Sequence, residues 1–401
     1  MHILLISRCP PYPLHLGDRL ILYHLARELS QRGYVLDLLA FDDRPDIPDE
    51  PEAYAAFFRR VKIIPAPQRT QASILRRLLQ AGSRFPQRAE DAWSPSMWHD
   101  IRHRLEETSY DLAHLFGGVQ VYEYRNTLES LKTIITPYES YSLYLRRMVN
   151  APHATLIQRL SSYLQFQIAR RYERFMFAPY CRTVVVSEPD KAELLRHNPA
   201  LNVSVIPNGI DLEQFQPHHS ERETATLLFT GNFEYAPNVD AAFYLANTLM
   251  PAVRAQLPEA KLWLVGNAPP PELRALASDH ILVTGRVPDV RPYLQQATAF
   301  VSPLRLGAGI KNKVLEALAL GCPVVATPLS VDGIAVQHER DALISELNAL
   351  PDAVLRLLRD EALRRQLSTN GRALIEAQYT WKRVAEMYAA LYQTVIDQVQ
   401  C

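Results

Sequence analysis

Short apolar runs alternate with longer amphipathic stretches along most of this chain, and this alternation restricts its fold more than any other feature. In the first half, apolar runs lie at 2–7, 34–41, 111–116 and 132–137. Between the first two, Leu22, Leu25 and Leu29 have the spacing of an amphipathic helix, and Gly33 is suited to end it. Strands that alternate with helices predict a parallel sheet covered by helices.

The alternation starts again in the second half, with apolar runs at 226–233, 261–266, 280–287 and 299–303. A chain of 401 residues is also too long for one hydrophobic core. The stretch 207–217 has proline, Asn-Gly and no periodicity, which is typical of a domain boundary. We therefore predict an α/β fold of two doubly wound parallel-sheet domains that face a cleft. Ligands of such sheets bind outside the carboxyl ends of the strands.

Composition and charge exclude several classes of protein for this chain. Lysine plus arginine equals aspartate plus glutamate, 43 against 43, which argues against a nucleic-acid-binding protein. The four cysteines are far apart without zinc-like spacing, so we expect reduced thiols. The first apolar run is too short for a signal peptide, and no run is long enough for a membrane span. We expect a cytoplasmic protein, with contact to the inner face of a membrane left open.

The stretch LRLGAGIKNKVLEALALGCPVVATP, residues 304–328, has the composition of an anion site. A strand runs into a turn with Gly307 and Gly309, and a helix is expected from about Ile310. Free amides and the positive end of the dipole would lie at the start of that helix. Lys311 and Lys313 add full positive charge there, which favours phosphate.

A single carboxylate, Glu316, lies in the apolar part of the same helix. It follows Asn312 by four residues and Lys313 by three, so the three side chains can share one face. A carboxylate among apolar neighbours needs partners, and a ribose diol would supply two hydroxyl donors. The alternative interpretation is an ordinary surface helix with a Lys–Glu pair and a glycine turn that packs well.

At this point the chain resembles the GT-B glycosyltransferases of family 4. The block GAGIKNKVLEALALGCPVVATP resembles the most diagnostic block of that family, and its form resembles the branch of exopolysaccharide- and exosortase-associated sugar transferases. VVVSEPDKAELL, VIPNGIDLEQFQP, LLFTGNF, LVGNAP and VTGRVPDVRPYLQQA follow the family's order. The resemblance is weakest at 43–108. It implies an acceptor-side domain at 1–207, a nucleotide-sugar domain at 208–378 and a last helix, 379–401, that crosses back to the first domain.

The resemblance also implies a function and a set of partners. The expected reaction is transfer of a sugar from a nucleotide-diphosphate sugar to a hydroxyl acceptor, with retention at the anomeric carbon. No cofactor and no metal is expected beyond the nucleotide sugar, whose base stays open. The acceptor would be a glycan or a lipid-linked molecule, in polysaccharide, lipid-linked glycan or glycoconjugate synthesis.

Individual roles carry over by position. Lys313 and Lys311 would meet the diphosphate during catalysis, Glu316 would bind ribose, and Gly17 and Asp18 form a loop beside phosphate and acceptor. The residues implied at the donor are Glu316, Gly307, Gly309, Ile310, Asn312, Leu315, Arg286, Val287, Arg305, Asn232 and Gly231.

Three positions depart from the family pattern. Ala308 stands where the family often has a second acidic residue, while Asn232 and Pro237 replace the usual Arg and Lys. Loss of the acid at 308 puts the choice of donor sugar in doubt. Two alternatives therefore stay open: a degenerate protein that binds sugar nucleotide without transfer, and a nucleotide-sugar epimerase or hydrolase.

Three further features in the first half have two interpretations each. His114, at the end of an apolar strand, is either a catalytic residue that contacts the sugar or a buried structural histidine. Glu139 lies either on the acceptor side or simply at a helix start. The arginines and aromatic residues of 146–178 form either a face for anionic lipid or an amphipathic helix with a solvated basic side. The spacing of the apolar residues favours the second interpretation.

Overall fold

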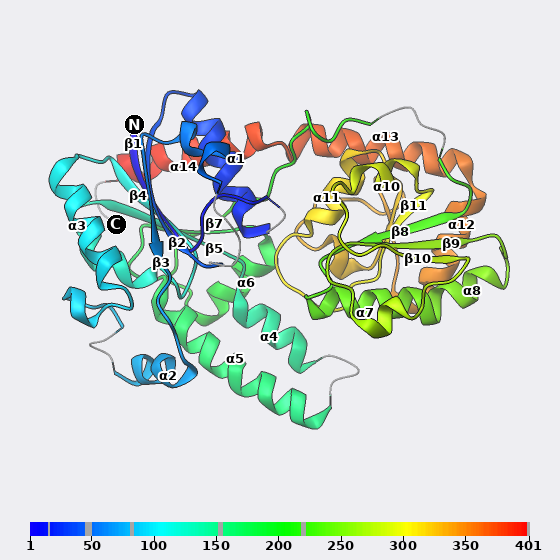
Figure 1. Cartoon of the computed structure of the whole chain (residues 1–401), viewed down its shortest axis with the longest axis horizontal. Helices are drawn as coiled ribbons and strands as arrows, with labels where there is room; N and C mark the ends of the chain where they lie inside the picture. Colours follow the sequence, from blue (N-terminus) through cyan, green and yellow to red (C-terminus); the bar gives the residue numbers. More distant parts are fainter. Residues whose placement is uncertain (15–16, 45–49, 81–83, 151–154, 218–221, 399–401) are drawn as a thin grey trace. The chain divides into compact units, whose positions relative to one another are not determined.

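The computed structural model describes residues 1–14, 17–44, 50–80, 84–150, 155–217 and 222–398. The chain divides into two compact units (Figure 1). The first contains Met1–Pro207 and the segment that begins at Trp381, and the second is Asn208–Thr380. Each unit has its own parallel sheet, so the predicted fold class of two Rossmann-like domains is confirmed.

The sheet of the first unit has seven described strands in the order β3-β2-β1-β4-β5-β6-β7, and every pair is parallel. These strands are β1 (His2–Ser7), β2 (Val35–Asp42), β3 (Arg60–Pro65), β4 (Leu112–Phe116), β5 (Lys132–Tyr138), β6 (Arg182–Val185) and β7 (Val203–Val205). The chain leaves β1 in one direction for β2 and β3, then returns on its other side with β4. The switch point between β1 and β4 is where such sheets bind ligands.

Helices cover this sheet. They are α1 (Gly17–Gln31), α2 (Gln71–Leu79), α3 (Pro95–Glu107), α4 (Tyr141–Val149), α5 (Leu156–Met176), α6 (Glu188–His197) and α14 (Trp381–Asp397). Although α1 and α14 lie at opposite ends of the sequence, they pack against each other (Figure 1). Their contact includes the ring of His24 stacked on that of Trp381, with the ring centroids 4.7 Å apart. The end of the chain therefore completes the first unit.

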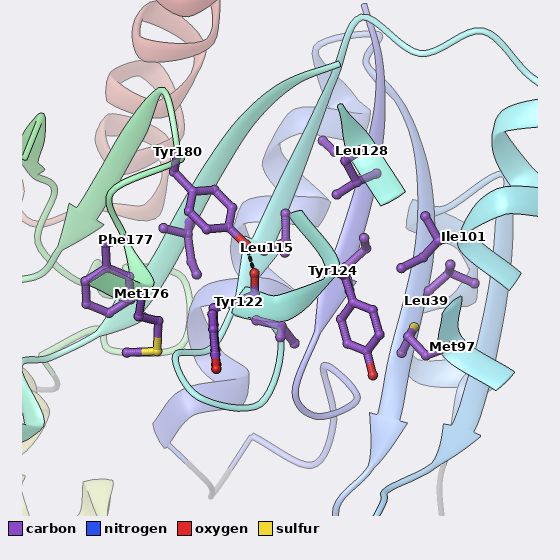
Figure 2. Close-up of a cluster of buried hydrophobic side chains, with 14 of the residues drawn as sticks. Leu39, Met97, Ile101, Leu115, Tyr122, Tyr124, Leu128, Met176, Phe177 and Tyr180 are labelled. Atoms are coloured by element: carbon purple, nitrogen blue, oxygen red, sulfur yellow. Dashed lines mark hydrogen bonds between the residues drawn. The ribbon is translucent and has the colours of Figure 1, made fainter. Parts of the chain in front are cut away.

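A cluster rich in aromatic residues forms the core on one face of this sheet (Figure 2). The hydroxyl of Tyr180 donates to the carbonyl oxygen of Tyr122 at 2.7 Å, so the polar end of a buried ring is satisfied. Met97 and Ile101 of α3 belong to the same cluster. The stretch 43–108, where the sequence showed no regular pattern, thus contributes β3, α2, α3 and part of the core.

The sheet of the second unit has six described strands in the order β10-β9-β8-β11-β12-β13, again all parallel. These strands are β8 (Thr226–Thr230), β9 (Lys261–Val265), β10 (Ile281–Val283), β11 (Ala299–Ser302), β12 (Val324–Ala326) and β13 (Leu343–Ile344). The switch point lies between β8 and β11. The loops that follow these two strands are therefore the expected ligand site of this unit.

The helices of the second unit are α7 (Ala236–Tyr244), α8 (Met250–Arg254), α9 (Pro271–Arg274), α10 (Arg291–Gln296), α11 (Asn312–Ala319), α12 (Leu350–Arg359) and α13 (Glu361–Gln378). Between α7 and α8 the chain forms a π-helical turn, Leu245–Leu249. Pro251 lies two residues after this turn, and because it has no backbone N–H, a regular α-helical hydrogen bond is missing there.

Two further expectations meet the structure here. Cys9 and Cys322 are free and buried, but Cys181 is disulfide-bonded, so the prediction of reduced thiols is wrong at that position. Linear spacing could not show this, because a disulfide depends on which segments the fold brings together. No helix in the described parts of the chain has the length and apolarity required to cross a membrane.

Candidate functional site

The turn between β11 and α11 is folded around a lysine. Gly307 and Gly309 have φ angles of 130° and 63°, which residues with a side chain rarely adopt. Lys311 is buried, and its ammonium group donates to the carbonyl oxygens of Ala308 at 2.9 Å and Gly309 at 2.6 Å. Lys311, predicted to meet a diphosphate, therefore holds the shape of the turn in this structure.

The helix that follows the turn begins without a side-chain cap. Lys311 is its N-cap residue, and within the described chain no side chain accepts from its first amides. These amides and the helix dipole favour an anion at this place. The predicted position of the anion site, at the start of this helix, thus coincides with the switch point between β8 and β11.

Lys313, in the first turn of α11, is aimed at the other loop of the switch point. Its Nζ donates to Oδ1 of Asn238 at 2.6 Å and lies 4.4 Å from the ring centroid of Phe229. Burial lowers the pKa of Lys313 to about 7, against the opposing attraction of Glu316. A cation held in this way lacks a full charge partner and would gain from a bound anion.

Asn238 is a residue of this site that sequence reasoning missed. Its Nδ2 donates to the carbonyl oxygen of Asn232 at 2.7 Å while its Oδ1 accepts from Lys313, so it ties the loop after β8 to α11. The sequence feature that could have indicated it is its position directly after Pro237, where this chain departs from the family pattern. A polar residue that is buried in the first turn of α7 requires such partners.

The loop after β8 leaves room for the lysine. A Cβ at Gly231 would lie 3.0 Å from Nζ of Lys313 and 2.9 Å from Nδ2 of Asn238. At Gly266, where φ is 151°, a Cβ would lie 1.8 Å from the carbonyl oxygen of Gly231. Two glycines therefore let the ends of β8 and β9 approach closely beneath the site. The side chain of Asn232 bonds to Glu234 within the same loop.

Glu316 is a half-buried carboxylate on the same helix as Lys313. Burial raises its pKa to about 6, although Lys313 opposes this. Among the described residues, no hydrogen bond or ion pair to its carboxylate is found. One turn earlier, Oδ1 of Asn312 accepts from Nδ2 of Asn208 at 2.7 Å, and the buried Oδ1 of Asn208 has no partner in the described structure. Polar acceptors are thus available for hydroxyl donors of a ligand.

The other residues predicted for the donor have different surroundings. The guanidinium of Arg305 forms a two-point ion pair with Asp240 of α7, at 2.6 Å and 2.7 Å. Arg286 is exposed and Val287 half-buried on the loop after β10. Ile310 and Leu315 are buried and pack within the unit.

In the first unit, α1 begins at Gly17, and Asp18 in its first turn binds an arginine that sequence reasoning did not single out. The guanidinium of Arg8 lies 2.9 Å from Oδ2 of Asp18 and 4.9 Å from the ring centroid of Tyr138. Burial disfavours the charge, but Asp18 keeps the pKa of Arg8 above its usual value. Arg8 comes directly after the buried strand β1, at the carboxyl end where such sheets bind ligands. A charged residue at that position could have indicated a role in the site.

The structure favours the structural interpretation of His114 over the catalytic one. The ring is fully buried in the middle of β4 and both of its nitrogens are bonded, Nδ1 to the Tyr392 hydroxyl at 2.7 Å and Nε2 to Thr136 Oγ1 at 2.8 Å. Burial lowers its pKa to about 3, so it stays neutral at ordinary pH. The sequence left both interpretations of His114 open, because its hydrogen-bond partner Tyr392 lies 278 residues away in the chain.

Glu139 is exposed after β5 and lines a pocket of about 510 Å³ at the carboxyl edge of the sheet of the first unit. Arg8, Gly118 and Pro137 line the same pocket, which we call the sheet-edge pocket. It lies at the switch point of that sheet, as a ligand site should. Chemically, the second unit can bind an anion and hydroxyl groups, and the first offers a partly apolar pocket lined by one basic residue, Arg8, and two acidic residues, Glu139 and Glu173.

Comparisons with known proteins show which family this chain resembles. A family model described as Glycosyltransferase Family 4 matches residues 20–214, and one described as Glycosyl transferases group 1 matches residues 224–360. A GDP-mannose-dependent alpha-(1-6)-phosphatidylinositol monomannoside mannosyltransferase of Mycobacterium tuberculosis is 28% identical over 218 residues, which are 48% of this chain and 56% of that protein. The putative glycosyltransferase YtcC of Bacillus subtilis is 21% identical, over 74% of this chain and 75% of that protein. The alignment thus covers only about half the length of the mannosyltransferase relatives.

Solved structures show the same fold. Sucrose-phosphate synthase from Thermosynechococcus elongatus has a TM-score of 0.72 at 20% identity, covering 98% of both chains. The Anabaena protein HepE, in complex with UDP and glucose, has a TM-score of 0.67 at 14% identity, covering 98% of this chain and 100% of that one.

Proposed function

Since the chain belongs to the family 4 (group 1) glycosyltransferases with the GT-B fold, we propose that it transfers a sugar from a nucleoside-diphosphate sugar to a hydroxyl acceptor. The observation that carries this proposal is Glu316, a half-buried carboxylate one turn from Lys313 at an uncapped helix start, for which the described residues supply no hydrogen bond or ion pair. The two hydroxyl groups of a ribose would donate to the carboxylate of Glu316, while the diphosphate would bind at the helix start beside Lys313.

The chemistry assigned to these residues is stabilisation of the leaving diphosphate. Negative charge builds on the oxygen that separates from the sugar, and fixed donors aimed at it lower the barrier; one such donor is typically worth about 3 kcal/mol. Lys313 is suited to this role because burial has removed water from its ammonium group, while no carboxylate of the described residues lies at ion-pair distance from it. Charge that develops in the transition state strengthens this interaction more than it strengthens ground-state binding.

We propose retention at the anomeric carbon and a reaction that needs no metal ion, as the resemblance to the family implies. In a front-face route, the departing phosphate oxygen takes the proton of the acceptor hydroxyl while that hydroxyl oxygen bonds to the anomeric carbon on the same face. Lys313 and the first amides of α11 would then hold the phosphate in place for both events. On the acceptor side, Glu139 and Arg8 would orient the incoming hydroxyl through the sheet-edge pocket.

The test of this function is a nucleotide-binding panel. Thermal-shift and calorimetric measurements would compare GDP, UDP and ADP on the wild type and on Glu316→Ala. GDP and UDP lead the panel because the mannosyltransferase relatives are named as GDP-mannose-dependent and HepE was solved with UDP. We expect one nucleotide to stabilise the wild type and Glu316→Ala to lose that stabilisation.

A matched control is Glu259→Ala, because Glu259 is an exposed glutamate of the same unit. This variant should bind as the wild type does. Equal binding by wild type and Glu316→Ala would remove Glu316 from the site, and no binding by any nucleotide would refute the proposed function.

A degenerate protein that binds sugar nucleotide without transferring it is the second candidate. It is favoured by Ala308, which is buried in the turn and cannot hold the hydroxyl groups of a donor sugar. Nucleotide binding without transfer to any acceptor would support it. Turnover of the nucleotide sugar without any acceptor would instead support an epimerase or hydrolase.

A further inference from the structure

Helix α5 exposes an apolar stripe along its first half. Leu156 and Ile157 are 84% and 82% exposed, and Leu160 and Leu164 are 61% and 56% exposed. The spacing of these residues places them on one side of the helix, together with Tyr163 and Ile168. Single exposed leucines are ordinary, but a continuous exposed stripe of this length marks a surface that something covers.

The second half of the same helix face is basic. Arg171 and Arg174 continue the line of Leu160 and Leu164 at helical spacing, and Arg170 lies beside them. All three are exposed, and no ion pair to any of them is found among the described residues. Glu193 of α6, which lies near these arginines, is already paired with Arg146 and Arg196. The face therefore carries net positive charge directly after its apolar part.

Helix α2 extends this surface. Leu75 and Leu79 of α2 are 45% and 66% exposed, and the Tyr172 hydroxyl of α5 donates to the carbonyl oxygen of Ile74 at 2.7 Å, which links the two helices (Figure 1). Both helices line a broad hollow of about 1210 Å³ whose rim includes Arg170, Arg171 and Arg174. We call the exposed residues of α2 and α5 together the α2–α5 face.

The sheet-edge pocket shares part of this face. Leu75 and Ile168 line both the broad hollow and the sheet-edge pocket, and Tyr141, 53% exposed, is part of the latter. From there the pocket is bounded by Ala169 and Met176 and reaches Arg8 and Glu139. An apolar passage thus leads from the exposed face to the carboxyl edge of the sheet.

We propose that the α2–α5 face docks on the surface of an anionic phospholipid bilayer. The leucine and isoleucine side chains enter the boundary between headgroups and acyl chains, and Arg170, Arg171 and Arg174 pair with anionic headgroups. The sequence pattern had favoured an ordinary solvated helix because its apolar residues did not form a clean stripe, and the exposed fractions overturn that argument. Apolar side chains next to unpaired arginines fit a surface that is both apolar and negatively charged.

Docking in this way has a consequence for the acceptor, which rests on the proposed sugar transfer. An acceptor embedded in the bilayer would reach Glu139 and Arg8 through the sheet-edge pocket, with its apolar chain against Ala169 and Met176. The acceptor class would then be an amphiphile with a hydroxyl-bearing headgroup.

The experiment is co-sedimentation of the full chain with vesicles of phosphatidylcholine alone and of phosphatidylcholine with an equal part of phosphatidylglycerol. We expect binding to the mixed vesicles that weakens as salt is raised. Arg170→Gln with Arg171→Gln and Arg174→Gln should lower the affinity about a hundredfold, since each arginine near an anionic surface is worth a factor of about five. Leu160→Ser with Leu164→Ser should lower it at least about tenfold.

Matched controls are Leu282→Ser, an exposed leucine of β10, and Arg102→Gln, an exposed arginine of α3, both of which should bind vesicles as the wild type does. Absence of wild-type binding to mixed vesicles, or unchanged binding by the α5 variants, would overturn the proposal. So would a dimer in solution that Leu160→Ser with Leu164→Ser dissociates, because a second copy would then cover the face. Nucleotide stabilisation of the α5 variants, measured in parallel, separates this outcome from a failure of the proposed transfer.

Discussion

The ammonium group of Lys313 lies 2.6 Å from Oδ1 of Asn238, and through this contact the first turn of α11 is joined to the first turn of α7. The amide group of Asn238 uses its other end to hold the carbonyl oxygen of Asn232. One side chain therefore fixes both loops at the switch point of the second unit. The cation is positioned by a neutral partner, so its charge remains available to an anion.

Asn238→Ala should therefore weaken both nucleotide binding and sugar transfer. Lys313 would lose its positioning partner, and the carbonyl of Asn232 would lose a donor, which typically costs about 1–3 kcal/mol when the group is buried. The measurement is calorimetry with the preferred nucleotide, together with urea unfolding. The control is Asn370→Ala, because Asn370 is a half-buried asparagine of α13 whose amide donates to the carbonyl oxygen of Arg340, away from this site. Wild-type nucleotide affinity in Asn238→Ala would contradict the positioning role.

Nucleotide binding should depend on pH between about 6 and 7. Burial lowers the pKa of Lys313 to about 7, so its positive charge in the free protein is lost as pH rises through that value. Burial raises the pKa of Glu316 to about 6, so its carboxylate charge is lost as pH falls through that value. A bound diphosphate favours the charged lysine, so binding above pH 7 should take up a proton.

Calorimetry in buffers of different ionisation enthalpy measures this proton uptake directly. Lys313→Gln should abolish the uptake above pH 7 while Glu316 still titrates. Equal proton uptake by wild type and Lys313→Gln would show that another group is responsible.

Lys311 and Lys313 should differ in what their removal does. Lys311 donates to two carbonyl oxygens inside the turn, so Lys311→Met should lower the free energy of unfolding by about 2–3 kcal/mol as well as weaken nucleotide binding. Lys313→Ala should slow transfer more than it weakens binding, because its charge acts mainly on the leaving diphosphate. Urea unfolding and steady-state kinetics on both variants make the comparison. A fully stable Lys311→Met would contradict the structural role of Lys311.

Gly231→Ala should damage the nucleotide site through crowding. The new methyl group would lie 3.0 Å from Nζ of Lys313 and 2.9 Å from Nδ2 of Asn238, so both must move. Overpacking of this kind typically costs about 1–3 kcal/mol. Gly118→Ala is the matched control, because the closest atoms to its new methyl group are 3.8 Å away. The prediction is wrong if the two variants have equal nucleotide affinity relative to wild type.

His114 should couple energetically to Tyr392 and leave the pH profile of transfer unchanged. The two side chains share a buried hydrogen bond of 2.7 Å, so a double-mutant cycle of His114→Ala and Tyr392→Phe should give a coupling of about 1 kcal/mol in the free energy of unfolding. Because the pKa of His114 is about 3, the histidine does not titrate where activity is measured. A pH profile of kcat that changes in a stable His114 variant would restore its catalytic interpretation.

The fold class follows from the sequence by itself, and so does the grouping of the glycine turn, Lys311, Lys313 and Glu316 in one short segment. Periodicity of apolar residues is a local property, and buried parallel strands such as β1 and β4 are nearly continuous apolar runs. The glycine turn, the two lysines and Glu316 are close in sequence, so they lie near one another however the rest of the chain packs. In contrast, β3 was not predicted, because it lies at the edge of the sheet with only Ile64 buried and so lacks the continuous apolar run of the central strands.

Only the tertiary structure decided what distant residues do to one another. Asn238 acquires its role from Lys313, 75 residues later, and His114 becomes structural through Tyr392, 278 residues later. The basic helix α5 reads as an ordinary amphipathic segment until the fold shows which of its leucines remain uncovered. Burial and hydrogen-bond partners are set by which elements pack together. A sequence pattern can indicate where a helix begins, but not which neighbouring element the helix packs against.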